Sequence, residues 1–311
     1  MSKYETLAKY EGTVFRRITG VTRKTFNKMV EILTTAYNSK HKNRGRHSKL
    51  CIEDMLLATL EYLREYRTFA HIAASYRIHE SNMYRTICWV EDILIKDGTF
   101  ALPGRKTLLS DDSDYVVILI DGTESPIERP KKRQRRYYSG KKKRHTIKTL
   151  VVVEKATGKI VCIFFAYGKK HDFKLFKESK LVFKPETLVQ TDSGFQGIQK
   201  LHVNSEVPTK RTKNNPLSKE EKKRNHKIAS ERVSNEHRIG RIKRFRILSE
   251  RYRNRRRRFG LRFSLIAGIC NFEINYNSHL ENCSTVEIAS NTKLVGAFHF
   301  QFLDTMCAVS C

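Results

Sequence analysis

The hydrophobic pattern of this sequence changes near residue 115, and the change divides the chain into two kinds of structure. Before it, apolar residues such as Phe26, Met29 and Leu33 recur at the spacing of a helix with one buried face. After it, apolar residues come in short β-branched runs such as residues 115–120 (YVVILI), which are typical of strands buried on both faces. We therefore predict an all-α N-terminal domain followed by an α/β domain.

Residues 68–92 have the pattern of a helix-turn-helix, with a short helix, a turn and a longer helix. Arg77 stands where glycine is usual in such turns, so it would need a positive φ or a different turn. Three outward positions on the second helix are candidate contacts to DNA bases or phosphates, and they are Ser81, Asn82 and Arg85. An ordinary α-hairpin that serves only for packing fits the same pattern equally well.

The second part of the chain is predicted to mix strands and helices. Strands are expected at residues 115–120, 146–153, 160–166 and 187–191, and helices at residues 172–180, 218–248 and 261–275. A turn at Thr157-Gly158 is expected to join the second and third strands as a hairpin. This order of elements predicts an α/β fold built on a mixed sheet.

The net charge points to a polyanionic partner. Lys and Arg number 61 against 32 Asp and Glu, which gives a net charge of +29. Neutralising phosphates releases counterions, so nucleic acid is the partner that such a surface favours. The charge is also clustered, which is more typical of a DNA-binding surface than of a merely soluble basic protein.

The densest cluster is residues 131–144 (KKRQRRYYSGKKKR), between the first two expected strands. We predict a DNA-contacting hairpin there, with Tyr137 or Tyr138 able to stack on an exposed base. A solvated charged loop is the alternative. The candidate DNA contacts in this segment are Lys131, Lys132, Arg133, Arg135, Arg136, Lys141, Lys142 and Lys143.

The seven cysteines form no CxxC pair and show no zinc-ligand spacing, so we expect reduced thiols. The sequence opens with no signal peptide, and no apolar run reaches the ~18 residues that a membrane span needs. These features predict a soluble cytosolic protein that works where the DNA is and not in a membrane.

Three acidic residues form the candidate catalytic site. Asp121 and Asp192 each follow an apolar run that is expected to be a strand, and Glu236 lies in an expected helix. Acids at strand ends can converge at one edge of a sheet. Three carboxylates brought together would repel one another unless a divalent ion lay between them, and oxygen ligands suit Mg²⁺ or Mn²⁺. Two such ions ~3.5–4 Å apart can activate an attacking oxygen and stabilise a leaving oxygen at phosphorus.

Each acid also has a simpler interpretation when it is taken alone. Asp121 could belong to a turn with Gly122, Asp192 could form an Asx turn, and Glu236 could pair with Arg232 one helical turn earlier. His171-Asp172 similarly fits either an acid–base pair or, by preference, a helix cap provided by Asp172.

The residues around the acids resemble the DDE transposases of the bacterial insertion-sequence-five type, which are related to the Harbinger transposases. The matching motifs are Asp121-Gly122-Thr123, residues 191–195 (TDSGF), and an R-x3-E-x6-K segment formed by Arg232, Glu236 and Lys243. The segment GKKHD at residues 168–172 is similar as well. Two features depart from the family: Ala229 stands where a tyrosine is frequent, and residues 277–311 do not resemble the family's C-terminus.

The resemblance implies an RNase H-like catalytic domain behind a helix-turn-helix, with Asp121, Asp192 and Glu236 as metal ligands for two Mg²⁺ or Mn²⁺ ions. Arg232 and Lys243 would contact DNA. On this basis the expected domains are residues 1–105, with the helix-turn-helix at about 52–95, residues 113–276, and an atypical tail at 277–311 that could be disordered.

The implied activity is cleavage of double-stranded DNA at terminal inverted repeats, followed by strand transfer to target DNA. A homodimer in the DNA complex is expected from the resemblance, because two ends must be brought together. Two alternatives stay open: a catalytically silent DNA-binding regulator derived from a transposase, and an RNase H-like nuclease.

Overall fold

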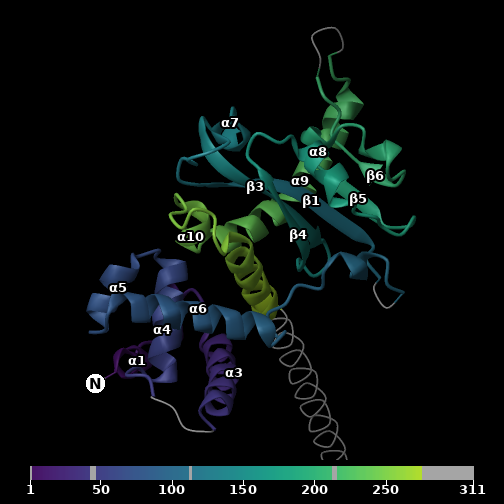
Figure 1. Ribbon diagram of the computed structural model, residues 1–311. Helices are drawn as coiled ribbons and strands as arrows, with labels where there is room; N and C mark the ends of the chain where they lie inside the picture. The colour runs from purple at the N-terminus through teal and green to yellow at the C-terminus, as the bar shows by residue number, and fades with distance from the viewer. Residues whose placement is uncertain (1, 43–46, 112–113, 212–215, 275–311) are drawn as a thin grey trace, which may run out of the picture. The chain divides into compact units, whose positions relative to one another are not determined.

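The computed structural model describes residues 2–42, 47–111, 114–211 and 216–274 (Figure 1). The expected tail at residues 277–311 lies outside the described residues. Throughout the described ranges, every helix is too short or too polar to cross a lipid bilayer.

The N-terminal part is helical, as the periodicity predicts. Its helices share one core that includes Phe15, Phe26, Leu56 and Leu63, all almost fully buried. The elements are α1 (Lys3–Ala8), α2 (Gly12–Thr19), α3 (Arg23–His41), α4 (Ile52–Arg64), α5 (Phe69–Ser75) and α6 (Glu80–Lys96).

Helices α5 and α6 form the expected short helix, turn and longer helix. Thr68 caps α5 by accepting a hydrogen bond from the His71 N–H, and Arg77 has a φ of +54° in the turn. Of the two options open to this arginine, a positive φ or a different turn, the structure has the positive φ. Met83 and Ile87 on α6 are fully buried, so the opposite side of α6 faces solvent.

The α/β part is built on a mixed sheet with strand order β2-β3-β1-β5-β6, and β4 pairs with β3. Strand β3 pairs antiparallel with β1, β2 and β4, whereas β5 pairs parallel with β1 and β6. The strands are β1 (Val117–Pro126), β2 (Tyr138–Ser139), β3 (Arg144–Glu154), β4 (Ile160–Tyr167), β5 (Leu188–Thr191) and β6 (Ser205–Glu206). The mixed-sheet α/β prediction is confirmed.

Strand β1 is longer than its apolar run predicts. The expected end at Asp121 is wrong, because antiparallel pairing with β3 continues from Ile118 to Pro126. Only the parallel pairing with β5 stops at Ile120. Asp121 therefore lies in the middle of β1, at the point where one neighbouring strand ends and the other continues.

Helices and short turns complete the fold, and some of their bounds differ from the prediction. The elements are η1 (Arg105–Leu108), α7 (Gln134–Tyr137), α8 (Asp172–Ser179), η2 (Ser193–Phe195), η3 (Ile198–Lys200), α9 (Lys219–Lys243) and α10 (Arg246–Ser249), and residues 259–274 are also helical. The single helix expected at 218–248 is interrupted, because Phe245 has an extended backbone and its side chain is fully buried.

Apolar residues cover both faces of the sheet. Leu119, Val151 and Val153 belong to a core cluster that also contains residues of α10 and of the helix at 259–274. Ile118 and Val152 belong to a second cluster that contains residues of α8. Alternate residues of each strand therefore pack into different cores. Because both faces of the strands are buried, their sequences are continuous apolar runs.

Polar contacts attach the helix at 259–274 to other elements. Asn271 both donates to and accepts from the backbone of Ile160 at 2.8 Å, at the start of β4. Fully buried Glu91 of α6 accepts hydrogen bonds at 2.7 Å from Arg258 Nε and Arg262 Nε. Because a buried carboxylate needs such partners, this network ties α6 to the end of the α/β part.

Candidate active site

The sheet register brings two of the three predicted acids to the same level. Ile120 of β1 is paired in parallel with Thr191 of β5, and the next residues along the two strands are Asp121 and Asp192. Since neighbouring strands lie ~4.8 Å apart, the two aspartates leave adjacent strands side by side. The register thus brings Asp121 and Asp192 to one level, and their convergence on a shared ion stays a prediction.

Local hydrogen bonds orient both carboxylates. The Gly122 N–H donates to Asp121 Oδ1 at 2.8 Å, and the Gly194 N–H donates to Asp192 Oδ1 at 2.8 Å. Asp192 thus forms the Asx turn considered as an alternative, and it caps η2. This turn is compatible with a catalytic role, because it holds the carboxylate at the end of β5.

Helix α9, which carries the third acid, is attached to the sheet at two places. Near its middle, Glu231 Oε2 accepts a hydrogen bond from Gln190 Nε2 of β5 at 2.6 Å and lies 2.8 Å from Lys155 Nζ. At its end, Lys243 Nζ lies 3.4 Å from the carbonyl oxygen of Glu124 in β1.

These two attachments set the level of Glu236. Glu231 contacts Gln190, which is paired with Leu119 of β1, so Glu231 is level with Leu119. Lys243 contacts Glu124, so Lys243 is level with Glu124. Twelve helical residues rise ~18 Å and five strand residues ~17 Å, so α9 runs alongside β1. Glu236, ~7.5 Å beyond Glu231, is therefore level with Asp121.

In the structure the three carboxylates do not lie close enough together to share an ion. Glu236 is exposed on α9, and no group of three His, Cys, Asp or Glu side chains in the described part of the chain lies close enough to hold a metal ion. The donor set itself fits a hard divalent cation, because it consists of carboxylate oxygens. The structure thus aligns the acids on two adjacent strands and one neighbouring helix.

Lys243 is the cationic side chain next to Asp121. Burial lowers its pKa, the positive charges of Lys142 and Arg144 lower it further, and the carboxylates of Asp121 and Glu124 act in the opposite direction. Lys243 therefore lies within electrostatic reach of the site, as the R-x3-E-x6-K motif implies. Arg232 lies on α9, and its side chain is outside the described structure.

The opposite face of β1 holds a second acidic group that the sequence reasoning missed. Lys148 Nζ lies 3.1 Å from Asp172 Oδ1 and 3.8 Å from Glu124 Oε1, and Glu124 also accepts from Thr146 at 2.9 Å. The available signal was a charged residue inside each of two otherwise uncharged strand segments, Glu124 in residues 122–127 and Lys148 in residues 146–153.

The start of α8 corrects one prediction and explains one motif residue. His171, not Asp172, is the helix cap, since its Nδ1 accepts from the Phe173 N–H at 3.3 Å. Asp172 instead occupies the first helical position and reaches β1, where a Cβ on Gly122 would lie 2.6 Å from its Oδ1. Close approach of α8 therefore requires a glycine after Asp121.

The predicted basic hairpin is present only in part. Tyr138 and Ser139 pair with β3 around a turn at residues 140–143, whereas residues 131–137 form a loop and the short helix α7. Tyr138 is 42% exposed. The eight predicted cations are all exposed, and they are Lys131, Lys132, Arg133, Arg135, Arg136, Lys141, Lys142 and Lys143.

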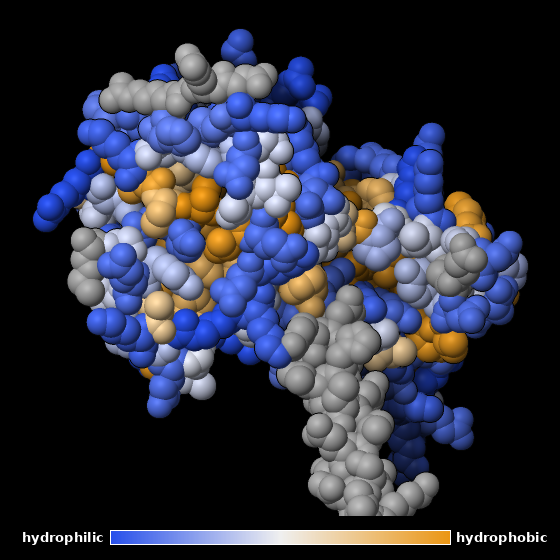
Figure 2. Space-filling view, turned by 90° about the horizontal axis from the view of Figure 1, so that it is seen from below, coloured by the Kyte–Doolittle hydropathy of each residue, from blue (hydrophilic) through white to orange (hydrophobic). Residues whose placement is uncertain are grey.

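The predicted contact residues of the helix-turn-helix also share one surface. Ser81, Asn82 and Arg85 are exposed on α6. Asn82 and Arg85 line a hollow of about 710 Å³ together with Lys49, Arg77 and other residues. Figure 2 shows that hydrophilic residues cover much of the visible face of the molecule. The structure thus leaves these side chains accessible to a ligand of DNA size.

Comparisons with known proteins identify the family. The family described as "DDE superfamily endonuclease" matches residues 120–271, and the one described as "Helix-turn-helix of DDE superfamily endonuclease" matches residues 48–100. A relative from Microchaete diplosiphon, named "Probable transposase for insertion sequence element IS702", is 46% identical over 260 residues, which cover 84% of this chain and 94% of the relative. The superfamily generally uses divalent metal ions. This chain therefore belongs to the DDE superfamily of endonucleases and carries the superfamily's DNA-binding helix-turn-helix ahead of an RNase H-like α/β domain.

Proposed function

We propose that this chain is the transposase of an insertion element, which binds terminal inverted repeats, cleaves the element ends and joins them to target DNA. One observation carries the proposal: Asp121 and Asp192 share a level on adjacent parallel strands, and Glu236 is level with them on α9. The name of the Microchaete relative, a probable transposase, supports the same activity.

Asp121, Asp192 and Glu236 would hold Mg²⁺ or Mn²⁺, in two sites if both ions bind, and the bound ions would supply activation of the attacking oxygen and neutralisation of charge at phosphorus. Lys243, beside Asp121, would place a positive charge against a phosphate oxygen of the strand being cut. Arg232 would act on the same strand from one helical turn before Glu236. Both cations would orient the phosphodiester and stabilise charge that develops on it.

DNA would be held at two surfaces. Ser81, Asn82 and Arg85 on α6 would contact the terminal repeat, because this exposed side of the second helix is the side that enters the major groove in a helix-turn-helix. The exposed cations of residues 131–143 would hold phosphates closer to the acids. A homodimer would pair two element ends, and the protein would work in the bacterial cytoplasm on nucleoid DNA. We propose domain boundaries at residues 1–105 and 113–276.

The test is metal-dependent nicking of DNA that carries the element's ends, with purified full-length protein. Asp121→Asn, Asp192→Asn and Glu236→Gln should each reduce nicking by about 10³-fold or more, the scale of losing a charge-stabilising group. DNA binding should persist in all three variants. Glu186→Gln, which removes an exposed acid elsewhere, is the matched control and should nick normally.

The outcome also separates the alternatives. Normal nicking by any one of the three variants would remove that acid from the proposed site. Hydrolysis without joining to target DNA would identify a nuclease. Repeat-specific binding with no nicking by the wild-type protein in Mg²⁺ or Mn²⁺ would identify a silent DNA-binding regulator.

A further inference from the structure

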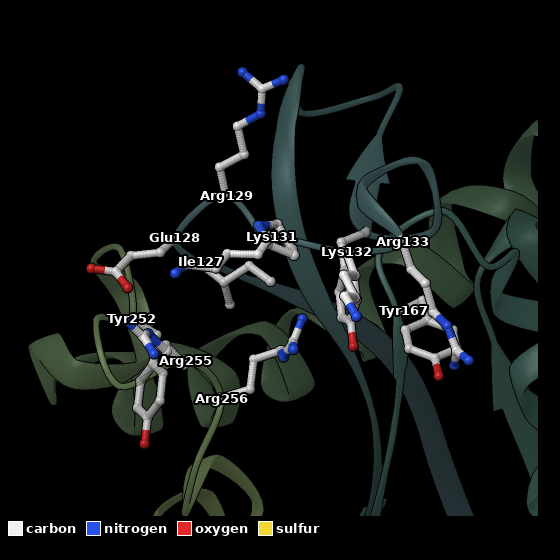
Figure 3. A pocket seen from close by; sticks show the side chains of 12 residues that line it. Ile127, Glu128, Arg129, Lys131, Lys132, Arg133, Tyr167, Tyr252, Arg255 and Arg256 are labelled. Atoms are coloured by element: carbon white, nitrogen blue, oxygen red, sulfur yellow. The ribbon is translucent and has the colours of Figure 1, made fainter.

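A hollow of about 580 Å³ lies just beyond the end of β1 (Figure 3). Its walls come from two basic stretches that are far apart in sequence, residues 127–133 and residues 255–256, together with Tyr137, Tyr167 and Tyr252. The volume falls inside the range of about 300–1,000 Å³ in which compact ligands bind. The hollow is therefore large enough for a ligand and not only for solvent.

The charge of the hollow favours an anion. Six cations line it against one acid, Glu128, and within the described residues none of the six forms an ion pair with an acid; they are Arg129, Lys131, Lys132, Arg133, Arg255 and Arg256. Figure 3 shows Lys132 and Arg256 on either side of the hollow, whereas the Arg129 side chain extends away from the other labelled side chains. Gathering like charges without counter-charge is unfavourable, and phosphate groups are the ligands that lysine and arginine clusters bind.

One wall of the hollow is aromatic. The Arg256 guanidinium lies over the Tyr137 ring, 4.5 Å from its centroid, and the Tyr167 ring meets Tyr137 edge-on with centroids 4.8 Å apart. A nucleobase can stack on the face of an arginine guanidinium or of a tyrosine ring, and this wall contains both kinds of group. The same cavity therefore offers a surface for a base and charges for a phosphate.

The backbone around the hollow is held in an unusual conformation. Arg133, Arg255 and Arg256 have φ values of +58°, +46° and +70°, in the left-handed region that costs a non-glycine residue free energy. Tyr252 N–H donates to Pro126 O at 2.9 Å, and Glu128 N–H donates to Tyr252 O at 3.2 Å. These bonds fix the two walls to each other, so the cations are presented by a preformed frame.

We propose that this hollow binds an unpaired nucleotide of the DNA substrate, with its phosphate on the cations and its base on the wall of Tyr137, Tyr167 and Arg256. The inference rests on the proposed function, because it takes DNA as the ligand. A duplex stacks its own bases, so only an unpaired base can use the wall. Ile127 lies six residues beyond Asp121, ~20 Å along β1, so the nucleotide is several positions from the cleaved phosphate.

The test compares two labelled probes by fluorescence anisotropy, a short blunt duplex and the same duplex with a single-stranded overhang. Full-length protein is used in excess chelator, so that no cleavage occurs. Wild-type protein should bind the overhang probe about 5- to 100-fold more tightly, the effect of one stacked base. Tyr167→Leu and Arg256→Gln should lose most of this preference.

A second variant isolates the phosphate contacts. Lys131→Gln/Lys132→Gln should weaken binding of the overhang probe and reduce its salt slope by about 0.7 for each lost contact. Lys174→Gln/Lys200→Gln removes two exposed charges elsewhere and should leave the overhang preference unchanged. Circular dichroism of each variant checks that it is folded.

Several outcomes would overturn the inference. A wild-type protein without overhang preference, or pocket variants that keep the preference, would remove the nucleotide site. An abasic overhang that binds as well as the normal one would overturn the base-stacking part. Metal-dependent nicking is measured separately, so normal nicking without overhang preference defeats only this inference, and overhang preference without nicking defeats only the proposed function.

Discussion

Strand β1 carries acids on both of its faces, and the two faces balance their charge differently. On one face, Glu124 and Asp172 share Lys148, whose side chain is 10% exposed. On the other face, Asp121 lies beside Asp192 and is level with exposed Glu236, and the nearby lysine, Lys243, comes from a helix and not from the sheet.

The difference separates an internal ion pair from a site that is open to ligands. A carboxylate buried within the sheet needs a permanent partner, because an uncompensated buried charge is strongly destabilising. Lys148 is that partner, so these two carboxylates need no bound metal ion to balance their charge. Asp192 and Glu236 stand at the end of a strand and on an exposed helix face, where a cation or a phosphate can reach them from solution.

Among the substitutions that test this comparison, Lys148→Met should have the largest effect on stability. Removing the lysine leaves Glu124 and Asp172 in a poorly solvated place without their counter-charge, so the free energy of unfolding should fall by about 3 kcal/mol. Urea denaturation followed by circular dichroism measures it. Lys174→Met, at an exposed position of α8, should change it by less than about 0.5 kcal/mol.

A second variant separates charge from packing. Lys148→Met/Asp172→Asn should recover part of the lost stability, because one of the two uncompensated carboxylates is then neutral. If Lys148→Met alone unfolds at the wild-type urea concentration, the ion pair is not what stabilises this face of β1.

Much of this fold could be predicted from residue patterns, and the parts that could not share a cause. The apolar runs predicted four of the strands, and the turn position of Arg77 offered a positive φ, which the structure has, as one of two options. The length of β1 was missed because residues 122–126 (GTESP) are polar or small and pair only with β3. Strand pairing beyond an apolar run depends on the neighbouring strand, which the local sequence does not specify.

The same limit applies to the site. The motifs indicated Asp121, Asp192 and Glu236; the register brings the two aspartates to one level, and the contacts of α9 with the sheet bring Glu236 to the same level. Contacts between elements distant in sequence, such as Lys148 with Asp172, follow from how α8 docks on the sheet. His171 was missed as the cap because Asp is the commoner capping residue, and Asp172 was already engaged by Lys148.

An effect of intermediate size on stability is expected from Gly122→Ala, which adds a methyl group where α8 packs on β1. The new Cβ would lie 2.6 Å from Asp172 Oδ1, so α8 or the Asp172 side chain must move, at a cost of about 1–3 kcal/mol. Thermal unfolding measures the loss, and Gly122→Ala should cost less in an Asp172→Ala background than in wild-type protein, because the Asp172 carboxylate is then absent. Gly140→Ala, where a Cβ meets nothing within 4 Å, is the control. An equal cost of Gly122→Ala in both backgrounds would mean that the carboxylate is not the obstacle.

The smallest effect concerns Lys243 and appears only in the pH dependence of stability. Burial lowers its pKa below the ordinary value of 10.5, so in the pH range between the two values the unfolded chain binds more protons than the folded one. Stability must then rise with pH through that range, because the cost of burying the charged lysine is present in full below the lowered pKa and disappears toward pH 10.5.

Urea denaturation at several pH values up to about 10 should give wild-type protein a steeper rise than Lys243→Met, by less than about 1 kcal/mol in all. Asp121→Asn removes a carboxylate that raises the pKa of Lys243, so it should extend the rise to lower pH. Parallel curves for wild type and Lys243→Met would show that Lys243 is solvated and not held against the acids on its face of β1.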